Sequence, residues 1–410
     1  MMEQKTPTRI VIVGAGQAGA ALAAKLRRLG FAGAITMIGA EAALPYERPP
    51  LSKAFLLGKI DAERLQLRPP SFYREQEITL LTGQTVQKIL PQDQLVRLED
   101  EALGYDALAL TTGSAPRKLP DAVTGGLRGV HVLRNIDDAR ALAKACGSAR
   151  RALVVGGGYV GLEATAVFRG LGIEVTLVEL GARILSRVAA PETADRLRDL
   201  HLSHGVTILE GTGLAELCGN GRVEEAVLTD GTTLPTDLVL AGIGAVARDG
   251  LARDAGLAVQ DGILVDRFGR SSDPAIYAAG DCARFPFDGV PTRLESVQNA
   301  VDQAEHVAAN MLGQATPYHP VPWFWSDQYD LKLQIAGLGH GHEQVVIRPG
   351  KRDGAVSHWY FRGGSMKAVD ALNDPASFML GRRLLEKGCR VRPEDVGGST
   401  AHLRQILESA

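Results

Sequence analysis

The chain has 410 residues, of which 45% are hydrophobic and 22% charged, and its formal net charge is −2. This length predicts two or three domains, and the near-neutral charge with only 5% aromatic residues argues against nucleic-acid binding. No apolar stretch reaches the ~20 residues that span a bilayer, and Met1 to Pro7 lack the apolar core of a signal peptide, so we expect a cytoplasmic protein without a membrane segment.

The first predicted element is a buried strand that leads into a glycine-rich turn. The apolar run Arg9 to Val13 precedes Gly14-Ala15-Gly16-Gln17-Ala18-Gly19, and a helix over about 17–29 and a strand over 34–38 follow. In a G-x-G-x-x-G turn between strand and helix, the glycines permit the tight turn, the close approach of a pyrophosphate and helix–strand packing. We therefore expect a bound dinucleotide here, and the candidate residues are Gly14, Gly16, Ala18 and Gly19.

The same pattern occurs a second time. A strand over 152–155 precedes Gly156-Gly157-Gly158-Tyr159-Val160-Gly161-Leu162-Glu163, and a helix over 162–171 and a strand over 174–179 follow, with Gly172 as the helix stop. Two such turns predict two bound dinucleotides, with electrons passing from one to the other. The candidate residues of the second turn are Gly156, Gly158, Tyr159, Gly161 and Glu163.

An acidic residue about 20 positions after such a turn binds the adenosine ribose. Glu41 and Glu179 occupy these places, although either could instead be a solvated surface charge. At the second site a carboxylate accepts from both ribose hydroxyls and repels a 2′-phosphate, which favours NADH over NADPH. Arg183 is the counter-argument, because an arginine could pair with that phosphate. A buried strand over 238–240 is followed by Gly242, Ile243 and Gly244, where backbone without side chains would let a nicotinamide lie close.

A proline-rich segment carries a resemblance to a known family. The segment Leu44-Pro45-Tyr46-Glu47-Arg48-Pro49-Pro50-Leu51-Ser52-Lys53 resembles the Pro-Pro-Leu-Ser-Lys signature of the FAD-dependent NADH:ferredoxin reductases of oxygenase systems. The resemblance implies that Lys53 lies near flavin N5 and that Glu163 faces the nicotinamide amide and can pair with Lys53. Without the resemblance, Lys53 would be an exposed lysine on a rigid connection.

Two further segments resemble the flavin motifs of the same family. The run 107–113 ends in Thr111-Thr112-Gly113, with Thr111 in place of the usual alanine, and the run 273–283 contains Gly280-Asp281. The resemblance implies that the aspartate binds the ribityl chain and that a helix over about 295–312 points its N-terminus at the flavin, with Val297 near the ring. The flavin contacts it implies are Lys53, Val86, Thr112, Gly113, Arg134, Asp281, Val297 and Trp325, although a lone valine or arginine such as Val86 or Arg134 is more often structural.

Cysteine and histidine spacing argues against other redox or metal chemistry. Cys146, Cys218, Cys282 and Cys389 are all far apart in the sequence, so neither a C-x-x-C pair nor a zinc site is expected. Electrons must then leave the flavin directly, unless distant cysteines meet in the fold. His201 and His204 have helical metal-site spacing, but no third ligand accompanies them, and we expect a solvated helix surface and no metal.

The remaining chain predicts a small third domain. Trp323-Phe324-Trp325 precede strands over 331–337, 344–348, 356–361 and 367–372 and a helix over 375–387. The tryptophans could anchor this domain's core or, as the resemblance implies, lie near the flavin and the docking face. A basic cluster formed by Arg382, Arg383, Lys387, Arg390 and Arg392 is either a solvated face or a contact for an acidic ferredoxin.

These observations predict an α/β fold with two Rossmann-like dinucleotide-binding domains and a C-terminal α+β domain. We assign residues 1–117 and 247–318 to the FAD domain, 118–246 to the NAD domain and 319–410 to the C-terminal domain. The resemblance implies a reductase that passes electrons singly from FAD to a [2Fe–2S] ferredoxin serving a cytochrome P450 or a ring-hydroxylating dioxygenase. The alternatives are an NADH oxidase, a monodehydroascorbate or quinone reductase, or a signalling flavoprotein resembling apoptosis-inducing factors.

Overall fold

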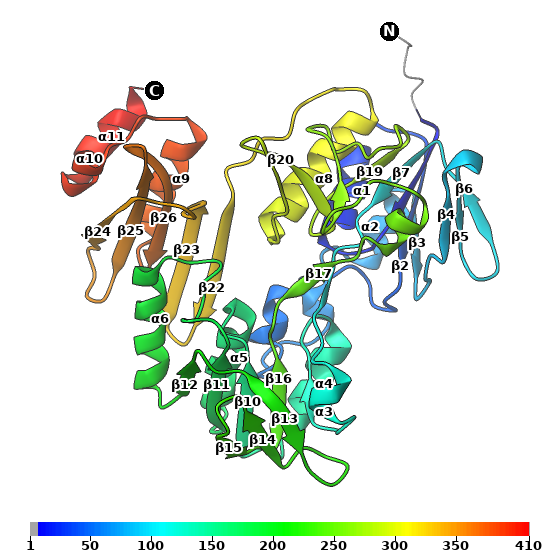
Figure 1. Cartoon of the computed structure of the whole chain (residues 1–410). Helices are drawn as coiled ribbons and strands as arrows, with labels where there is room; N and C mark the ends of the chain where they lie inside the picture. Colours follow the sequence, from blue (N-terminus) through cyan, green and yellow to red (C-terminus); the bar gives the residue numbers. More distant parts are fainter. Residues whose placement is uncertain (1–6, 410) are drawn as a thin grey trace. The chain divides into compact units, whose positions relative to one another are not determined.

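The computed structural model describes residues 7–409, which fall into two compact units. The first contains the chain up to Glu47 together with Ala62–Ala115 and Ala245–Pro320. The second contains Arg48–Asp61, Pro116–Gly244 and the chain from Val321 onward. Both units are therefore built from segments that are distant in the sequence (Figure 1). Among the described residues, no helix combines the length and the apolar composition needed to cross a bilayer.

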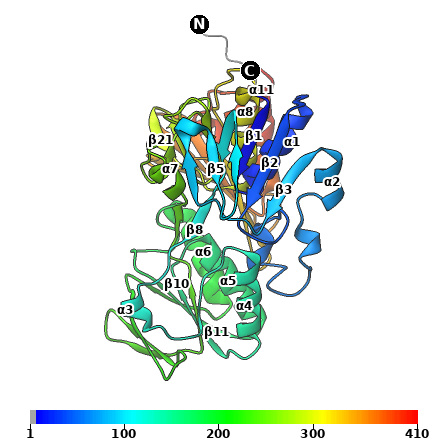
Figure 2. The ribbon, with the colours of Figure 1, turned by 90° about the vertical axis from the view of Figure 1, so that its right-hand side faces the viewer.

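The first unit is built on a parallel sheet with the strand order β19-β7-β1-β2-β3. Its strands are β19 (Ile276–Ala278), β7 (Ala107–Leu110), β1 (Arg9–Val13), β2 (Ala34–Gly39) and β3 (Ile78–Thr82). Figure 2 shows β1, β2 and β3 side by side. The two glycine-turn strands were predicted within a residue of their observed ends, because a central parallel strand is an uninterrupted apolar run.

Both faces of this sheet are covered. Side chains alternate along a strand, so Ile10 and Ile12 of β1 join one apolar cluster while Val11 and Val13 join another. The first cluster contains residues of α1 (Gln17–Arg28) and α8 (Val297–Met311), which lie next to each other in Figure 1. The small residues of α1 allow this close helix packing.

The other elements of the first unit are short. They are η2 (Glu63–Leu65), α2 (Pro70–Glu75), β4 (Lys88–Leu90), η3 (Pro91–Asp93), β5 (Leu95–Arg97), β6 (Ala102–Gly104), α7 (Gly250–Asp254), β18 (Ile263–Leu264), β20 (Ala283–Phe287) and β21 (Val290–Thr292). A two-stranded sheet of β8 (Ser114–Pro116) and β17 (Ala245–Ala247) stands where the chain passes from one unit to the other.

The second unit contains a second parallel sheet with the order β12-β11-β10-β16-β9. Its strands are β12 (Thr207–Glu210), β11 (Glu174–Glu179), β10 (Arg151–Val155), β16 (Leu238–Ala241) and β9 (Val130–His131). A small antiparallel sheet accompanies it, formed by β13 (Leu214–Cys218), β14 (Glu225–Leu228) and β15 (Thr233–Pro235). The helices of this part are η1 (Pro49–Ser52), α3 (Asp121–Thr124), α4 (Ile136–Cys146), α5 (Tyr159–Gly170) and α6 (Pro191–Ser203).

The same unit also holds the five-stranded antiparallel sheet β22-β23-β26-β25-β24. It consists of β22 (Trp323–Gln328), β23 (Leu331–Gly337), β24 (Gln344–Pro349), β25 (Val356–Arg362) and β26 (Ser365–Leu372), and α9 (Pro375–Glu386), α10 (Pro393–Gly397) and α11 (Thr400–Glu408) follow. Four of its strands were predicted, but β22 was not, because its aromatic residues were interpreted only as anchors or ring contacts.

Helix α6 packs one face against this antiparallel sheet (Figure 1). Thr193, Leu197 and His201 are spaced four residues apart, which places them on one side of the helix, and none of the three is exposed. The expectation of a solvated helix surface is therefore wrong for His201, although His204 is exposed as expected. One face of the helix meets a second packed layer, so Thr193 and His201 on that face are buried partners and not solvent contacts.

Candidate functional site

The first glycine turn has the backbone geometry that only glycine allows at its closest points. Gly14 has a φ of +115°, and a Cβ added there would lie 2.2 Å from the Thr111 carbonyl oxygen. A Cβ on Gly19 would lie 2.0 Å from the Gly14 carbonyl oxygen, whereas a Cβ on Gly16 would meet nothing within 4 Å. The outer glycines are thus required by packing, and Gly16 faces open space.

The second glycine turn repeats this arrangement. Gly156 has a φ of +104°, and a Cβ there would lie 2.5 Å from the Gly242 carbonyl oxygen. A Cβ on Gly161 would lie 2.3 Å from the Gly156 carbonyl oxygen. The amide of Gly242 donates to the Val155 carbonyl at 2.7 Å, so Gly242 lies directly beside the turn.

The two helices that open at these turns present anion-binding ends. Gly16 is the N-cap of α1 and Gly158 is the N-cap of α5, and neither glycine has a side chain to accept from the first backbone amides. Neither helix has an acidic residue in its first turn. Free N–H groups with a positive dipole end fit a pyrophosphate, so both turns suit the dinucleotides expected there.

The acidic residue after the second turn is held against that turn. Glu179 lies at the end of β11, and its carboxylate accepts from the amides of Gly157 and Gly181, both at 2.7 Å. The guanidinium of Arg183 instead donates to the Ile184 and Ala189 carbonyls, at 3.2 and 2.7 Å. The Glu179 carboxylate therefore lies at the turn, while the Arg183 guanidinium is hydrogen-bonded to backbone carbonyls.

The expected flavin contacts of the first unit lie at the ends of its strands. Glu41 follows β2 and accepts from the Tyr46 hydroxyl at 2.5 Å. Asp281 follows β19, and its carboxylate accepts from the Ser114 hydroxyl at 2.8 Å. Thr112 follows β7 and donates to the Arg248 carbonyl at 2.6 Å. The carboxyl ends of parallel strands lie on one edge of a sheet, where ligands bind in open α/β folds.

The structure places the other predicted residues of the first unit as follows. Gly113 has a φ of +69° and accepts from the Arg248 amide at 2.9 Å. Val297 is the first residue of α8, whose start is capped by the Ser296 hydroxyl. Ala18 is buried on α1, and Val86 is buried in an apolar cluster, which supports its structural interpretation.

A buried carboxylate with three side-chain donors stands in the second unit. Glu163 on α5 is only 6% exposed, and its Oε1 lies 2.8 Å from the Lys53 ammonium. The Ser52 hydroxyl donates to Oε2 at 2.6 Å and the Ser326 hydroxyl donates to Oε1 at 2.7 Å. A buried charge is costly unless it is paired and hydrogen-bonded, and this one is both. The structure thus brings together Lys53 and Glu163, as the resemblance implied.

Sequence reasoning missed the two serines of this cluster. Ser52 stands within the proline-rich signature and Ser326 within β22. Ser52 is 111 residues from Glu163 in the chain, and Ser326 is 163 residues from it. The only available signal was the position of Ser52 next to Lys53. No spacing rule connects Ser326 with either residue.

The remaining predicted residues of the second unit surround the second turn and β22. The Tyr159 ring lies 4.6 Å from that of Phe324, and burial, with the charges of Asp370 and Glu163, raises the pKa of its unpartnered hydroxyl. Trp325 lies 5.5 Å from Trp323 between ring centres. The backbone of Arg134 precedes α4, accepts from Arg48 and donates to Asp138. Ile243 packs against an apolar cluster, and Gly244 has a φ of +96°.

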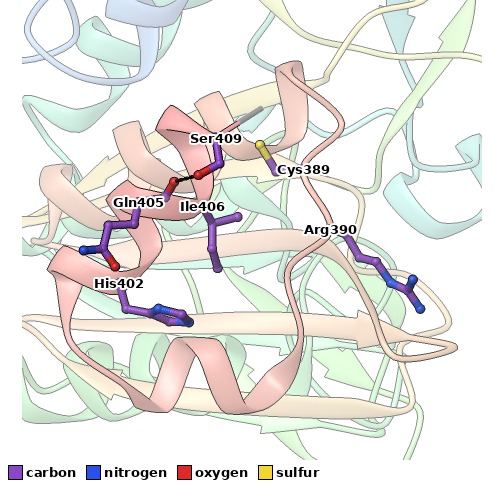
Figure 3. A pocket seen from close by; sticks show the side chains of 6 residues that line it. All are labelled: Cys389, Arg390, His402, Gln405, Ile406 and Ser409. Atoms are coloured by element: carbon purple, nitrogen blue, oxygen red, sulfur yellow. Dashed lines mark hydrogen bonds between the residues drawn. The ribbon is translucent and has the colours of Figure 1, made fainter.

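Neither a disulfide nor a metal cluster accompanies these residues. All four cysteines lie within the described residues and are free, and no group of three potential metal ligands occurs between residues 7 and 409. Cys282 is buried, its thiol donates to the carbonyls of Leu110 and Ala279, and burial raises its pKa. A pocket near the end of the chain is lined by Cys389, Arg390, His402, Gln405, Ile406 and Ser409 (Figure 3). None of the predicted cofactor-binding residues lines it, although Arg390 belongs to the predicted basic cluster.

Comparisons with known proteins agree with this geometry. Residues 8–304 match the family described as pyridine nucleotide-disulphide oxidoreductase, and residues 323–407 match the reductase C-terminal family. A ferredoxin–NAD(P)(+) reductase from Sphingomonas sp is 42% identical over 390 residues, which cover 94% of each chain.

Two solved structures are also similar over nearly their whole lengths. The ferredoxin reductase for the CYP199A2 system from Rhodopseudomonas palustris has a TM-score of 0.94 at 38% identity, covering 98% of this chain and 100% of that one. The putidaredoxin reductase in a covalent complex with putidaredoxin has a TM-score of 0.93 at 38% identity, covering 98% and 99%. The predicted α/β fold class and the family resemblance are confirmed. The chain therefore belongs to the pyridine nucleotide-disulphide oxidoreductase family, in the branch formed by the FAD- and NAD(H)-dependent ferredoxin reductases.

Proposed function

We propose that the protein is an FAD-dependent NADH:ferredoxin reductase that supplies electrons, through a [2Fe–2S] ferredoxin, to a cytochrome P450 or a ring-hydroxylating dioxygenase. The observation that carries the proposal is the ion pair of Lys53 with Glu163. It joins the signature segment of the ferredoxin reductases to the helix that opens at the second glycine turn. The similar putidaredoxin reductase is bound to its ferredoxin in a solved complex, which supports the choice of partner.

We assign FAD to the first glycine turn and NADH to the second. Glu41, Thr112, Gly113 and Asp281 lie beside the first turn's sheet edge and would hold the FAD ribose and ribityl chain, with Val297 and α8 at the ring. Gly156, Gly158 and Gly161 would hold the NADH pyrophosphate. When bound, FAD accepts a hydride from NADH and returns the electrons singly to an iron–sulfur acceptor. The proposed domains are 1–117 with 247–318 for FAD, 118–246 for NADH and 319–410 for the C-terminal part.

The chain's own residues position charge in this scheme. The free amides at the starts of α1 and α5 bind the two pyrophosphates. Glu163, fixed by Ser52 and Ser326, keeps the Lys53 ammonium at one place, where it stabilises negative charge. Trp325, Tyr159 and the backbone of Gly242 to Gly244 would bound the nicotinamide site. NADH as the donor also favours a cytoplasmic location.

The carboxylate at the second turn accounts for the choice of NADH. Glu179 is held toward the turn by two backbone amides, where it would accept from both ribose hydroxyls and repel a 2′-phosphate. Arg183, the residue that could reverse this preference, donates to two carbonyls. We therefore propose that the protein prefers NADH over NADPH as its electron donor.

The test measures turnover with purified protein and a panel of [2Fe–2S] ferredoxins, with cytochrome c as the final electron acceptor. Under anaerobic conditions NADH is expected to bleach the yellow protein, and at least one ferredoxin is expected to give turnover far above that of quinones, the monodehydroascorbate radical or oxygen. Bleaching without ferredoxin turnover would indicate an oxidase or quinone reductase. Colourless protein, or yellow protein that NADH does not bleach, would refute the proposal.

A further inference from the structure

A continuous series of hydrogen bonds in the second unit runs from the β22–β23 turn to Glu163. The Tyr329 hydroxyl lies 3.3 Å from Nδ1 of His201, and Nε2 of His201 lies 2.8 Å from Oε1 of Gln328. The Gln328 amide nitrogen donates to the Ser326 hydroxyl at 3.1 Å, which donates to Glu163 at 2.7 Å. His201, Gln328 and Ser326 are at most 1% exposed, so water does not compete for these bonds.

The direction of donation along this series depends on one histidine tautomer. Burial lowers the pKa of His201 to about 4, so its ring is neutral, with one N–H. A proton on Nε2 requires the Gln328 oxygen to face the ring, which turns the Gln328 NH₂ group toward Ser326. The Ser326 hydroxyl then accepts from Gln328, and its own proton is available to Glu163. A proton on Nδ1 would reverse the amide, and Ser326 would donate to Gln328 instead.

Tyr329, whose hydroxyl faces the His201 ring, is held in a costly backbone conformation. Tyr329 is in the two-residue turn between β22 and β23 with a φ of +54°, a region that glycine adopts more readily. Its ring stacks on His204 with centroids 3.7 Å apart, and its hydroxyl points at Nδ1 of His201. Burial raises the pKa of this hydroxyl to about 12, so it keeps the proton that it donates.

We propose that Tyr329 and His201 are positioning residues for the Lys53–Glu163 pair. The Tyr329 hydroxyl selects the Nε2–H tautomer of His201. Through Gln328, this tautomer keeps the Ser326 hydroxyl donating its hydrogen bond to the Glu163 carboxylate. The expected effect on the rate of flavin reduction rests on the proposed function of that pair. The tautomer of His201 does not depend on that function.

The first test reads the tautomer without any turnover. In ¹⁵N-histidine-labelled holoprotein, the two ring nitrogens of a neutral histidine have distinct shifts, and the His201 signals are assigned by their loss in His201→Asn. The wild type is expected to carry the proton on Nε2, and Tyr329→Phe, which keeps the ring stack, is expected to populate the Nδ1–H form. The control is Tyr360→Phe, which removes another buried hydroxyl bound near α6 and should leave the His201 tautomer unchanged. An Nδ1–H wild type, or no change in Tyr329→Phe, would overturn the proposal.

The second test is a double-mutant cycle on the rate of flavin reduction by NADH in a stopped-flow instrument. Tyr329→Phe and Ser326→Ala should each slow the reaction by about threefold to tenfold, the effect of one lost hydrogen bond. Because both act through the same proton, the double variant should be no slower than Ser326→Ala alone. If the rate reductions of the two single variants multiply in the double variant, the positioning role is contradicted. If Glu163→Gln itself leaves the rate unchanged, the proposed function of the pair fails; if Glu163→Gln slows the reaction and Tyr329→Phe does not, this inference fails.

Discussion

The ion pair of Lys53 with Glu163 makes a quantitative prediction about stability. At 2.8 Å and an effective dielectric constant of about 20, the attraction alone is about 6 kcal/mol. The desolvation of a carboxylate that is 6% exposed offsets much of this. Removing one partner of a buried pair costs about 3–5 kcal/mol, but Lys53 is 21% exposed and Glu163 keeps two hydroxyl donors. We therefore expect Lys53→Met to lower the free energy of unfolding by about 2–3 kcal/mol.

Urea unfolding of Lys53→Met, Glu163→Gln and the double variant measures the coupling directly. The sum of the losses of unfolding free energy in the two single variants should exceed the loss in the double variant. The difference, which is the coupling energy, should be about 2 kcal/mol. The same Lys53→Met protein should also reduce its flavin more slowly with NADH. A coupling energy below about 0.5 kcal/mol, the value of an exposed ion pair, would refute the reasoning. An unchanged rate of flavin reduction would remove Lys53 from the site.

The other predictions concern the turns, the nucleotide, pH and the partner. Gly19→Ala, whose Cβ would lie 2.0 Å from a carbonyl oxygen, should destabilise the fold, whereas Gly16→Ala, which meets nothing, should fold normally and bind FAD more weakly; equal melting temperatures for the two would contradict this. Glu179→Ala should lower the NADH/NADPH ratio of kcat/KM, and an unaltered ratio would exclude its ribose role. Burial raises the pKa of Asp370 to about 6, so the folded state holds this proton more tightly than the unfolded state, and its contribution to stability falls as pH rises from about 4 to 6. The free-energy difference between Asp370→Asn and wild type should therefore change by about 2 kcal/mol between pH 4 and pH 7, and a constant difference would refute the shift. Charge reversal of the exposed Arg383 and Arg390 should raise the KM for an acidic ferredoxin, most at low salt, while the exposed Lys144→Glu control should not; equal effects of both changes would argue against the basic cluster as the docking site.

Local pattern was sufficient for the strands that lead into and follow the two glycine turns. The strand Arg9–Val13 and the strand Glu174–Glu179 were predicted with their observed ends, because a buried parallel strand bounded by a glycine turn is defined within ten residues of sequence. Helix α5 was the partial failure, since it begins at Tyr159 and was predicted from Leu162. The turn and the first helical residues overlap in a G-x-G-x-x-G segment, and the motif alone does not separate them.

The sequence by itself determined the two nucleotide turns, the α/β fold class and the family, because each depends on residues that are neighbours in the chain. Only the tertiary structure decided the surroundings of Glu163: its hydroxyl donors Ser52 and Ser326 come from segments 111 and 163 residues away. It also decided that His201 is buried, since that depends on the antiparallel sheet that covers α6. Hydrogen bonds between distant segments leave no periodic trace in a sequence, and they become visible only when the packing of the layers is known.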